Sequence, residues 1–186
     1  NSSKKQILKE IFGYDSFRKG QEEIVDQILN GRDVLAIMPT GAGKSLCYQV
    51  PALLMSGITI VVSPLISLMI DQVKALNEAG VHAAYINSAL TERQITKALE
   101  LAAAGRYKMI YVAPERLLTP RFLDFACHTE LSMVTIDEAH CISQWGQDFR
   151  PSYVKITEFI RQLPRRPVVS AFTATATQKV REDILE

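Results

Sequence analysis

Short, almost continuously apolar runs alternate along the chain with longer segments whose apolar residues recur every three or four positions. Continuous Val, Ile and Leu runs are typical of strands buried on both faces of a parallel sheet. The longer segments have the spacing of amphipathic helices. Strands are therefore predicted at residues 34–38, 59–63, 83–86, 109–112, 133–136 and 168–172.

Helices are expected in the segments between these strands. Thr91 and Gln94 have the spacing of a capping box, which places a helix start there. The polar start of the chain, NSSKKQ, is expected to be irregular. Strands and helices that alternate in this way predict an α/β fold: a doubly wound, mostly parallel sheet with helices on both faces and ligands at the carboxyl ends of its strands. The predicted helices are residues 21–29, 44–54, 68–79, 92–103, 120–127, 152–162 and 177–185.

The bulk composition fits a single globular domain over residues 1–186. The formal net charge is +1, so any nucleic-acid binding must be local. No apolar run approaches the roughly 20 residues of a membrane-spanning helix. The three cysteines are far apart and form no C-x-x-C pair, which argues against a zinc site or a disulfide framework and suits a reducing cytoplasm.

The segment MPTGAGKS follows the first predicted strand and opens the next helix. Its backbone N–H groups can surround a phosphate, Lys44 can reach the β- and γ-phosphates, and the Ser45 hydroxyl can bind Mg²⁺. The strict phosphate-loop pattern is broken because Met38 replaces its first glycine, but Gly41 and Gly43 keep the backbone permissive. From these residues alone, a tight turn with a solvated lysine remains an alternative.

A second chemical signal follows the strand in LSMVTIDEAH. This strand delivers Asp137 and Glu138 to the same sheet edge as Lys44, where Asp137 can hold Mg²⁺ and Glu138 can orient or deprotonate a water. The alternative is an acidic helix N-terminus stabilised by the helix dipole. Together with the phosphate loop, the pair indicates a nucleoside triphosphate hydrolysed with Mg²⁺.

Asp-Glu-Ala-His with MPTGAGKS resembles motifs I and II of the superfamily 2 helicases. Further segments are similar to the RecQ branch: FGYDSFRKGQ at residues 12–21, VVSPLISLMIDQV at 61–73, YVAPERL at 111–117, DEAHCISQWGQDFRP at 137–151 and TATAT at 173–177. These blocks occur in family order over most of the chain. The resemblance implies a RecA-like P-loop NTPase domain, the first motor domain of a RecQ DNA helicase.

The resemblance also implies roles for individual residues. On the base side, Tyr14 would stack on adenine, Gln21 would hydrogen-bond its edge and Arg18 would help to hold the nucleotide. The catalytic residues would be Lys44, Asp137 and Glu138, with Ser45 and Asp137 on Mg²⁺. The residues expected to cradle the phosphates are Thr40, Gly41, Ala42, Gly43, Lys44 and Ser45. Those expected to bind DNA or couple it to ATP turnover are Ser63, Ser67, His140, Trp145, Phe149, Arg150, Thr173 and Thr175.

Ordinary structural roles compete with several of these assignments. From the residues alone, Tyr14 is better explained as an ordinary half-buried aromatic, and Trp145 is equally well explained as an anchor of its loop. For Ser63 and Ser67 the alternative is helix capping. Three positions also depart from the family pattern: Ala42 replaces a glycine of the phosphate loop, Ile70 a polar residue and Gln147 a histidine. Gln147 can still donate and accept hydrogen bonds, but it cannot carry charge.

The implied activity is an ATP- and Mg²⁺-dependent 3′-to-5′ DNA helicase for repair and recombination, cytoplasmic and, in a bacterium, associated with the nucleoid. Its partners would be single-stranded DNA, duplex junctions and a second RecA-like domain in cis, and no membrane. That second domain, a zinc module and C-terminal DNA-binding domains would lie outside this chain. The alternatives are a DEAD-box-like RNA helicase domain, against which the Trp145 loop argues, and a non-hydrolysing ATP-binding adaptor, against which Glu138 argues.

Overall fold

A computed structural model describes residues 2–38, 43–137 and 149–173 of the chain. Within these residues, all the strand pairs are parallel and form one six-stranded sheet with the order β1-β6-β5-β2-β4-β3. The predicted fold class is confirmed, and the strands deviate from the expected ranges only at their ends. The strands are β1 (Val34–Ile37), β2 (Ile58–Val62), β3 (Ala83–Ile86), β4 (Met109–Val112), β5 (Leu131–Ile136) and β6 (Val168–Thr173).

Apart from α1 and the short helix η1, which were not predicted, the described helices follow the prediction closely, and the capping box of Thr91 and Gln94 is present. Two of them begin earlier than expected, at Ile66 and at Phe149. The helix predicted at 177–185 lies outside the described residues. The helices are α1 (Ser2–Phe12), α2 (Gln21–Leu29), α3 (Lys44–Leu54), α4 (Ile66–Glu78), α5 (Glu92–Ala103), the short 3₁₀ helix η1 (Pro114–Arg116), α6 (Pro120–Cys127) and α8 (Phe149–Gln162). None of them is both long and apolar enough to cross a membrane.

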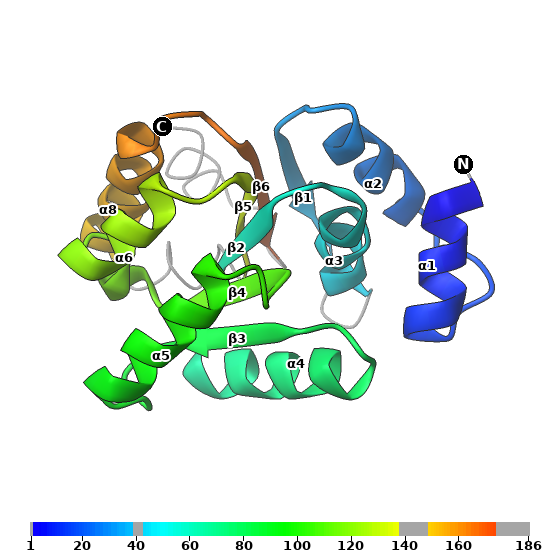
Figure 1. Cartoon of the computed structure of the whole chain (residues 1–186). Coiled ribbons are helices and arrows are strands. Elements are labelled where there is room, and N and C mark those ends of the chain that lie inside the picture. Colours follow the sequence, from blue (N-terminus) through cyan, green and yellow to red (C-terminus); the bar gives the residue numbers. More distant parts are fainter. Residues whose placement is uncertain (1, 39–42, 138–148, 174–186) are drawn as a thin grey trace.

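Helices cover both faces of the sheet, with α2, α3 and α4 on one side and α5, α6 and α8 on the other (Figure 1). Side chains of β2 alternate between the two layers: Ile60 and Val62 pack with α5, α6 and α8, whereas Val61 packs with α3 and α4. Each side therefore has its own apolar core, as the near-continuous apolar strands require.

The N-terminal helix α1 corrects the expectation of an irregular start. Leu8 is fully buried and packs against Val25 of α2 and Val50 of α3. Nζ of Lys4 lies 2.8 Å from a Glu22 carboxylate oxygen and also bonds Asp26, so its pKa is raised above the ordinary lysine value. A lysine can bury its stem while its ammonium group is paired, and a polar sequence therefore forms a packed helix.

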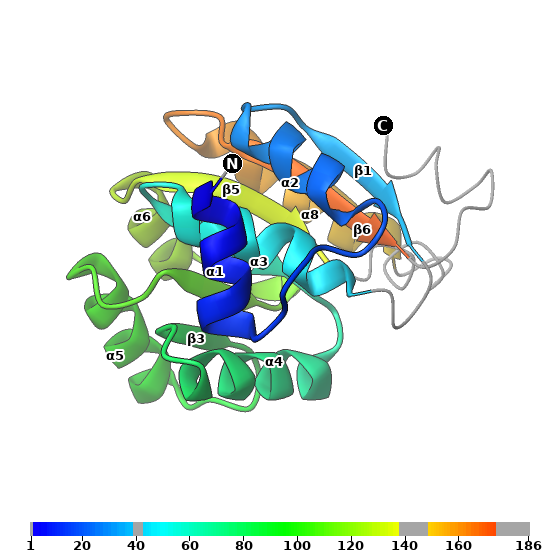
Figure 2. The same cartoon turned by 90° about the vertical axis from the view of Figure 1, so that its right-hand side faces the viewer.

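The carboxyl ends of five neighbouring strands, from β1 to β4 in the sheet order, meet at one edge of the sheet. The Met38 N–H donates to Thr173 O (2.9 Å), the Asp137 N–H to Val62 O (2.9 Å) and the Ser63 N–H to Val112 O (3.1 Å). The arrowheads of β1 and β6 point to this edge in Figure 2. The predicted phosphate loop, the acidic pair and the segment of residues 63–67 all follow strands that end here.

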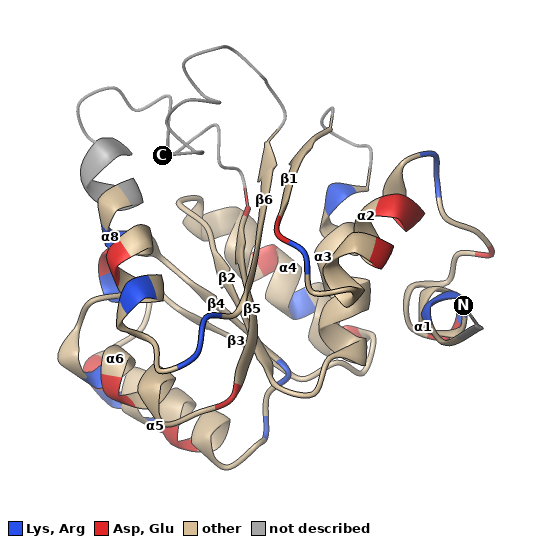
Figure 3. Cartoon of the chain, turned by 90° about the horizontal axis from the view of Figure 1, so that it is seen from above, with Lys and Arg blue, Asp and Glu red and all other residues tan. Residues whose placement is uncertain are grey.

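Charged residues lie on the helices and loops, and the six described strands contain no Lys, Arg, Asp or Glu (Figure 3). At the amino end of β1, Asp33 accepts two hydrogen bonds from Arg166, at 2.8 and 3.2 Å, and a third from the Val169 N–H at 3.0 Å. Burial raises the pKa of Asp33, but the bonds from Arg166 and Val169 outweigh it and hold the pKa below its usual range. Asp33 thereby ties β1 to β6.

Replacement of Asp33 by Asn is expected to cost about 1 kcal/mol of unfolding free energy at pH 7, because the carboxylate is half exposed. Its folded-state pKa lies below the unfolded value of about 3.9, so the contribution is complete above that pH and disappears as the pH falls through the folded pKa. Urea unfolding of both proteins at pH 7 and near pH 3 measures this. If the difference in unfolding free energy between wild type and Asp33→Asn is larger near pH 3 than at pH 7, the stabilising role of the ionised Asp33 carboxylate is contradicted.

Candidate functional site

The described part of the phosphate loop is fixed by Gly43, which caps α3 in the left-handed region with φ 74°. A Cβ at this position would lie 2.5 Å from Nε2 of Gln21, so any other residue would strain this backbone conformation and displace the Gln21 carboxamide. Lys44 and Ser45 form the first turn of α3. The positive end of the helix dipole and the lysine therefore point to one place, which suits a phosphate.

Lys44 and Asp137 come together although they follow different strands. Lys44 begins α3, and Asp137 follows β5 directly. Nζ of Lys44 lies 3.9 Å from Oδ1 of Asp137, and the two side chains are 12% and 1% exposed. Burying a carboxylate is costly unless it is paired and hydrogen-bonded. Its position at the edge where parallel strands end is the usual position of a ligand site in this fold class.

The second oxygen of Asp137 has a different partner. The hydroxyl of Tyr48 donates to Oδ2 of Asp137 at 3.0 Å, and it lies 3.3 Å from the hydroxyl of Tyr111. Both tyrosines are fully buried. Burial raises the pKa of each phenol, and the negative charge of Asp137 raises both further, so both hydroxyls keep their protons.

Two amide side chains complete this cluster. Nε2 of Gln49 donates to the Tyr111 hydroxyl at 3.0 Å, and the Tyr48 hydroxyl lies 3.1 Å from Oε1 of Gln72. Sequence reasoning did not assign a role to Tyr48, Gln49, Gln72 or Tyr111. The available signal was the pair Tyr48 and Gln49, two polar residues three and four positions after Ser45 in a mostly apolar helix.

Gln21 is 1% exposed at the start of α2, and its carboxamide bonds the protein at both ends. Oε1 accepts from the Arg18 N–H at 2.7 Å, and Nε2 donates to Gly43 O at 2.9 Å. The segment expected to read the base is therefore joined directly to the phosphate loop. Tyr14, by contrast, is 48% exposed beyond the end of α1.

The remaining predicted residues divide into those the structure describes and those it does not. Ser63 is buried, and its hydroxyl accepts from the Leu65 N–H at 3.3 Å, as a local cap does. Ser67 is exposed in the first turn of α4, and Thr173 is buried at the end of β6. Phe149 and Arg150 open α8. Outside the described residues lie Thr40, Gly41, Ala42, Glu138, His140, Trp145, Gln147 and Thr175.

The donor set at this edge fits Mg²⁺ better than it fits zinc. Mg²⁺ is usually bound through one or two carboxylates together with waters and the phosphates of the substrate. Asp137 supplies a buried carboxylate beside the Ser45 turn and Lys44. In the part of the chain that the structure describes, no three His, Cys, Asp or Glu side chains gather as a metal cage would require.

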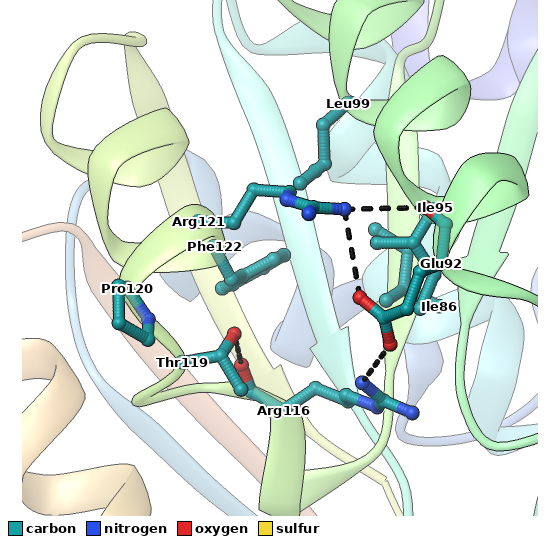
Figure 4. Close-up of a pocket in the computed structure, with 9 residues that line it drawn as sticks. All are labelled: Ile86, Glu92, Ile95, Leu99, Arg116, Thr119, Pro120, Arg121 and Phe122. Carbon is teal, nitrogen blue, oxygen red and sulfur yellow. Dashed lines mark hydrogen bonds and ion pairs between the residues drawn. The ribbon is translucent and has the colours of Figure 1, made fainter.

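A cavity of about 350 Å³ lies elsewhere, between α5, η1 and α6 (Figure 4). Ile95 and Phe122 belong to its apolar lining. At its rim, Glu92 accepts from Nη1 of Arg116 at 3.3 Å and lies 3.6 Å from Nη1 of Arg121. This carboxylate already offsets part of the charge of the two arginines, and the cavity contains none of the predicted site residues.

Comparison with known proteins agrees with the predicted resemblance. Residues 18–184 match the family model described as DEAD/DEAH box helicase. The chain is 52% identical over 96% of its length to the ATP-dependent DNA helicase RecQ of Bacillus subtilis and 48% identical over 96% to that of Haemophilus influenzae, and it covers 30% and 29% of them. It therefore spans less than a third of these relatives.

Among solved structures, the chain superposes on the DUF1998 helicase MrfA bound to DNA and AMPPNP with a TM-score of 0.78. The sequences are 18% identical, and the match covers 99% of this chain and 28% of that one. At this identity the likeness concerns the fold alone. On the family match and the RecQ relatives together, the chain belongs to the DEAD/DEAH box helicases.

Proposed function

We propose that this chain is the ATP-binding domain of an ATP-dependent 3′-to-5′ DNA helicase of RecQ type. The observation that carries the proposal is the meeting of Lys44 and Asp137, 3.9 Å apart, where α3 begins and β5 ends. That arrangement suits the hydrolysis of a Mg²⁺-bound triphosphate. The names of the RecQ relatives, all ATP-dependent DNA helicases, support DNA as the polymer.

The phosphate side of the site follows from the charges. The N-terminus of α3 and Lys44 attract the β- and γ-phosphates, while Asp137 and the hydroxyl of Ser45 hold Mg²⁺. Bound there, Mg²⁺ neutralises the charge that develops on the phosphates during transfer. Glu138, the next residue after Asp137, orients the attacking water. Thr40, Gly41 and Ala42 complete the cradle with their backbone N–H groups.

The residues proposed to bind the adenine end of the nucleotide are Tyr14, Arg18 and Gln21. Tyr14 is an exposed aromatic that offers its face to a base, and Arg18 helps to hold the nucleotide. Gln21 reads the adenine edge while it keeps its bond to Gly43, since a carboxamide has two N–H donors and two acceptor lone pairs. Base recognition and phosphate binding are thereby linked through one side chain.

Selectivity for the base tests this half of the site. The wild-type chain is expected to bind Mg·ATP about ten- to a hundredfold more tightly than Mg·GTP. Guanine would leave the polar groups of the protein that pair with the adenine edge without hydrogen-bond partners. Gln21→Ala is expected to reduce that preference strongly. Fluorescence titration of both proteins with both nucleotides, and with ADP and GDP, measures the ratio.

The same titration separates base reading from support of the loop. If Gln21 only holds Gly43, Gln21→Ala weakens ATP and GTP equally and the ratio stays that of the wild type, which contradicts the adenine role. Gln27→Ala, an exposed glutamine on α2, is the matched control for helix α2 itself.

The DNA side rests on the resemblance and on the positions of the strand ends. Ser67, exposed at the N-terminus of α4, suits a DNA phosphate better than Ser63, which is buried. Trp145, Phe149 and Arg150 would stack on and bind single-stranded DNA. The residues that would couple DNA to ATP are His140, Thr173 and Thr175.

The complete motor would need more than this chain. A second RecA-like domain in cis would close the nucleotide site and supply an arginine to the transferring phosphate. Such a motor would act on single-stranded DNA and duplex junctions in repair and recombination. In a bacterium its work on chromosomal DNA would place it in the cytoplasm, at the nucleoid.

A further inference from the structure

A buried cluster of side chains lies behind the metal-binding side of Asp137. Tyr48, at its centre, has a single hydroxyl proton and two nearby acceptors: Oδ2 of Asp137 at 3.0 Å and Oε1 of Gln72 at 3.1 Å. Its oxygen also lies 3.3 Å from the Tyr111 hydroxyl, which in turn accepts from Nε2 of Gln49. One proton cannot serve both acceptors.

The competition has a definite outcome. A hydrogen bond to an ionised carboxylate is about twice as strong as one between neutral groups, so the Tyr48 proton goes to Asp137. A half-turn of the Gln72 amide, which exchanges two atoms of nearly equal size, would then let its nitrogen donate to Tyr48. Since Tyr111 accepts from Gln49, its own proton points to Tyr48. The bonds therefore run in one direction, from Gln49 through Tyr111 and Tyr48 to Asp137.

The two oxygens of Asp137 consequently have separate tasks. Oδ2 receives the Tyr48 proton, while Oδ1 lies 3.9 Å from Nζ of Lys44. A carboxylate held by one oxygen cannot rotate freely about its terminal bond. The ring of Tyr48 is itself fixed, fully buried and packed against Phe172 with ring centroids 5.5 Å apart.

We propose that Tyr48 is a positioning residue for Asp137, holding one carboxylate oxygen so that the other is presented to Mg²⁺ and the nucleotide phosphates. The inference rests on the proposed function, in which Asp137 binds the metal. Partners that orient metal ligands in this way typically contribute 10–100-fold to metal affinity or activity.

Tyr48→Phe tests the role, with Tyr111→Phe as the matched control. Both remove one hydroxyl from a fully buried tyrosine of the same cluster, but the Tyr111 hydroxyl bonds Gln49 and Tyr48. A fluorescent ATP analogue is titrated against each protein in EDTA and at rising Mg²⁺ concentration. Urea unfolding is measured in parallel.

Tyr48→Phe is expected to raise the Mg²⁺ concentration at half-maximal binding about tenfold or more, with no change of affinity in EDTA. Tyr111→Phe is expected to lose similar stability without that shift. An equal shift in both variants, or none in Tyr48→Phe, would overturn the positioning role alone. If the wild-type chain shows no Mg²⁺-dependent binding of the ATP analogue, the proposed function is overturned and this inference falls with it.

Discussion

Joined to the domain that would follow it, the segment of residues 1–186 is expected to hydrolyse ATP about 10³ to 10⁵ times faster than the same segment alone. Phosphoryl transfer needs a positively charged group beside the γ-phosphate. In related NTPases an arginine from a neighbouring domain or from a partner protein supplies it. Several arginines of this chain are committed elsewhere: Arg166 to Asp33, and Arg116 and Arg121 to Glu92.

Steady-state ATPase assays of the short and the extended chain, with and without single-stranded DNA, measure this difference. The short chain is expected to bind Mg·ATP weakly, to show no DNA stimulation and to unwind no duplex. Lys44→Ala in both chains gives the background rate. Robust DNA-stimulated turnover by residues 1–186 alone would show that the site is already complete and would refute the two-domain proposal.

In the extended chain, Asp137→Ala is expected to lower the rate of ATP hydrolysis by about 10³-fold, because it removes the proposed carboxylate ligand of Mg²⁺. A metal ion contributes several kcal/mol of charge stabilisation in such transition states, which corresponds to roughly this factor. The side chain is 1% exposed and lies between Lys44 and Tyr48, which hold the carboxylate at this position.

Single-turnover hydrolysis at increasing Mg²⁺ concentration is the appropriate measurement, since it separates metal binding from the chemical step. Asp124→Ala is the control: its carboxylate is 80% exposed on α6 and lies 3.4 Å from His128. A rate for Asp137→Ala close to that of the control would remove Asp137 from the proposed metal site.

Most of the fold could be predicted because its signals are local. Buried parallel strands are continuous apolar runs, and β3 and β4 begin and end where the pattern places them. Helix α1 was missed for the opposite reason. The residues next to Lys4 in the chain are polar, so Lys4 is expected to be solvated. Its partners Glu22 and Asp26 lie beyond an intervening loop, and no local pattern reveals that they pair with it.

The candidate site divides in the same way. Lys44 and Asp137 could be found because each stands in a recognisable sequence directly after a strand. The bond between Tyr48 and Asp137 joins residues 89 positions apart, and that between Gln21 and Gly43 joins residues 22 apart. Neither contact has a local pattern, so only the folded chain reveals which polar side chains support the loop and the carboxylate.

The place of β6 in the sheet has a mechanical consequence. This strand lies between β1 and β5, and Thr173 ends it at the edge where Lys44 and Asp137 meet. Thr173 therefore lies between the two halves of the proposed ATP site, with β1 on one side and β5 on the other, each at one strand spacing of about 4.8 Å. A force applied at Thr173 would therefore act between Lys44 and Asp137, whereas a pull on β3 would act three strands away from β5.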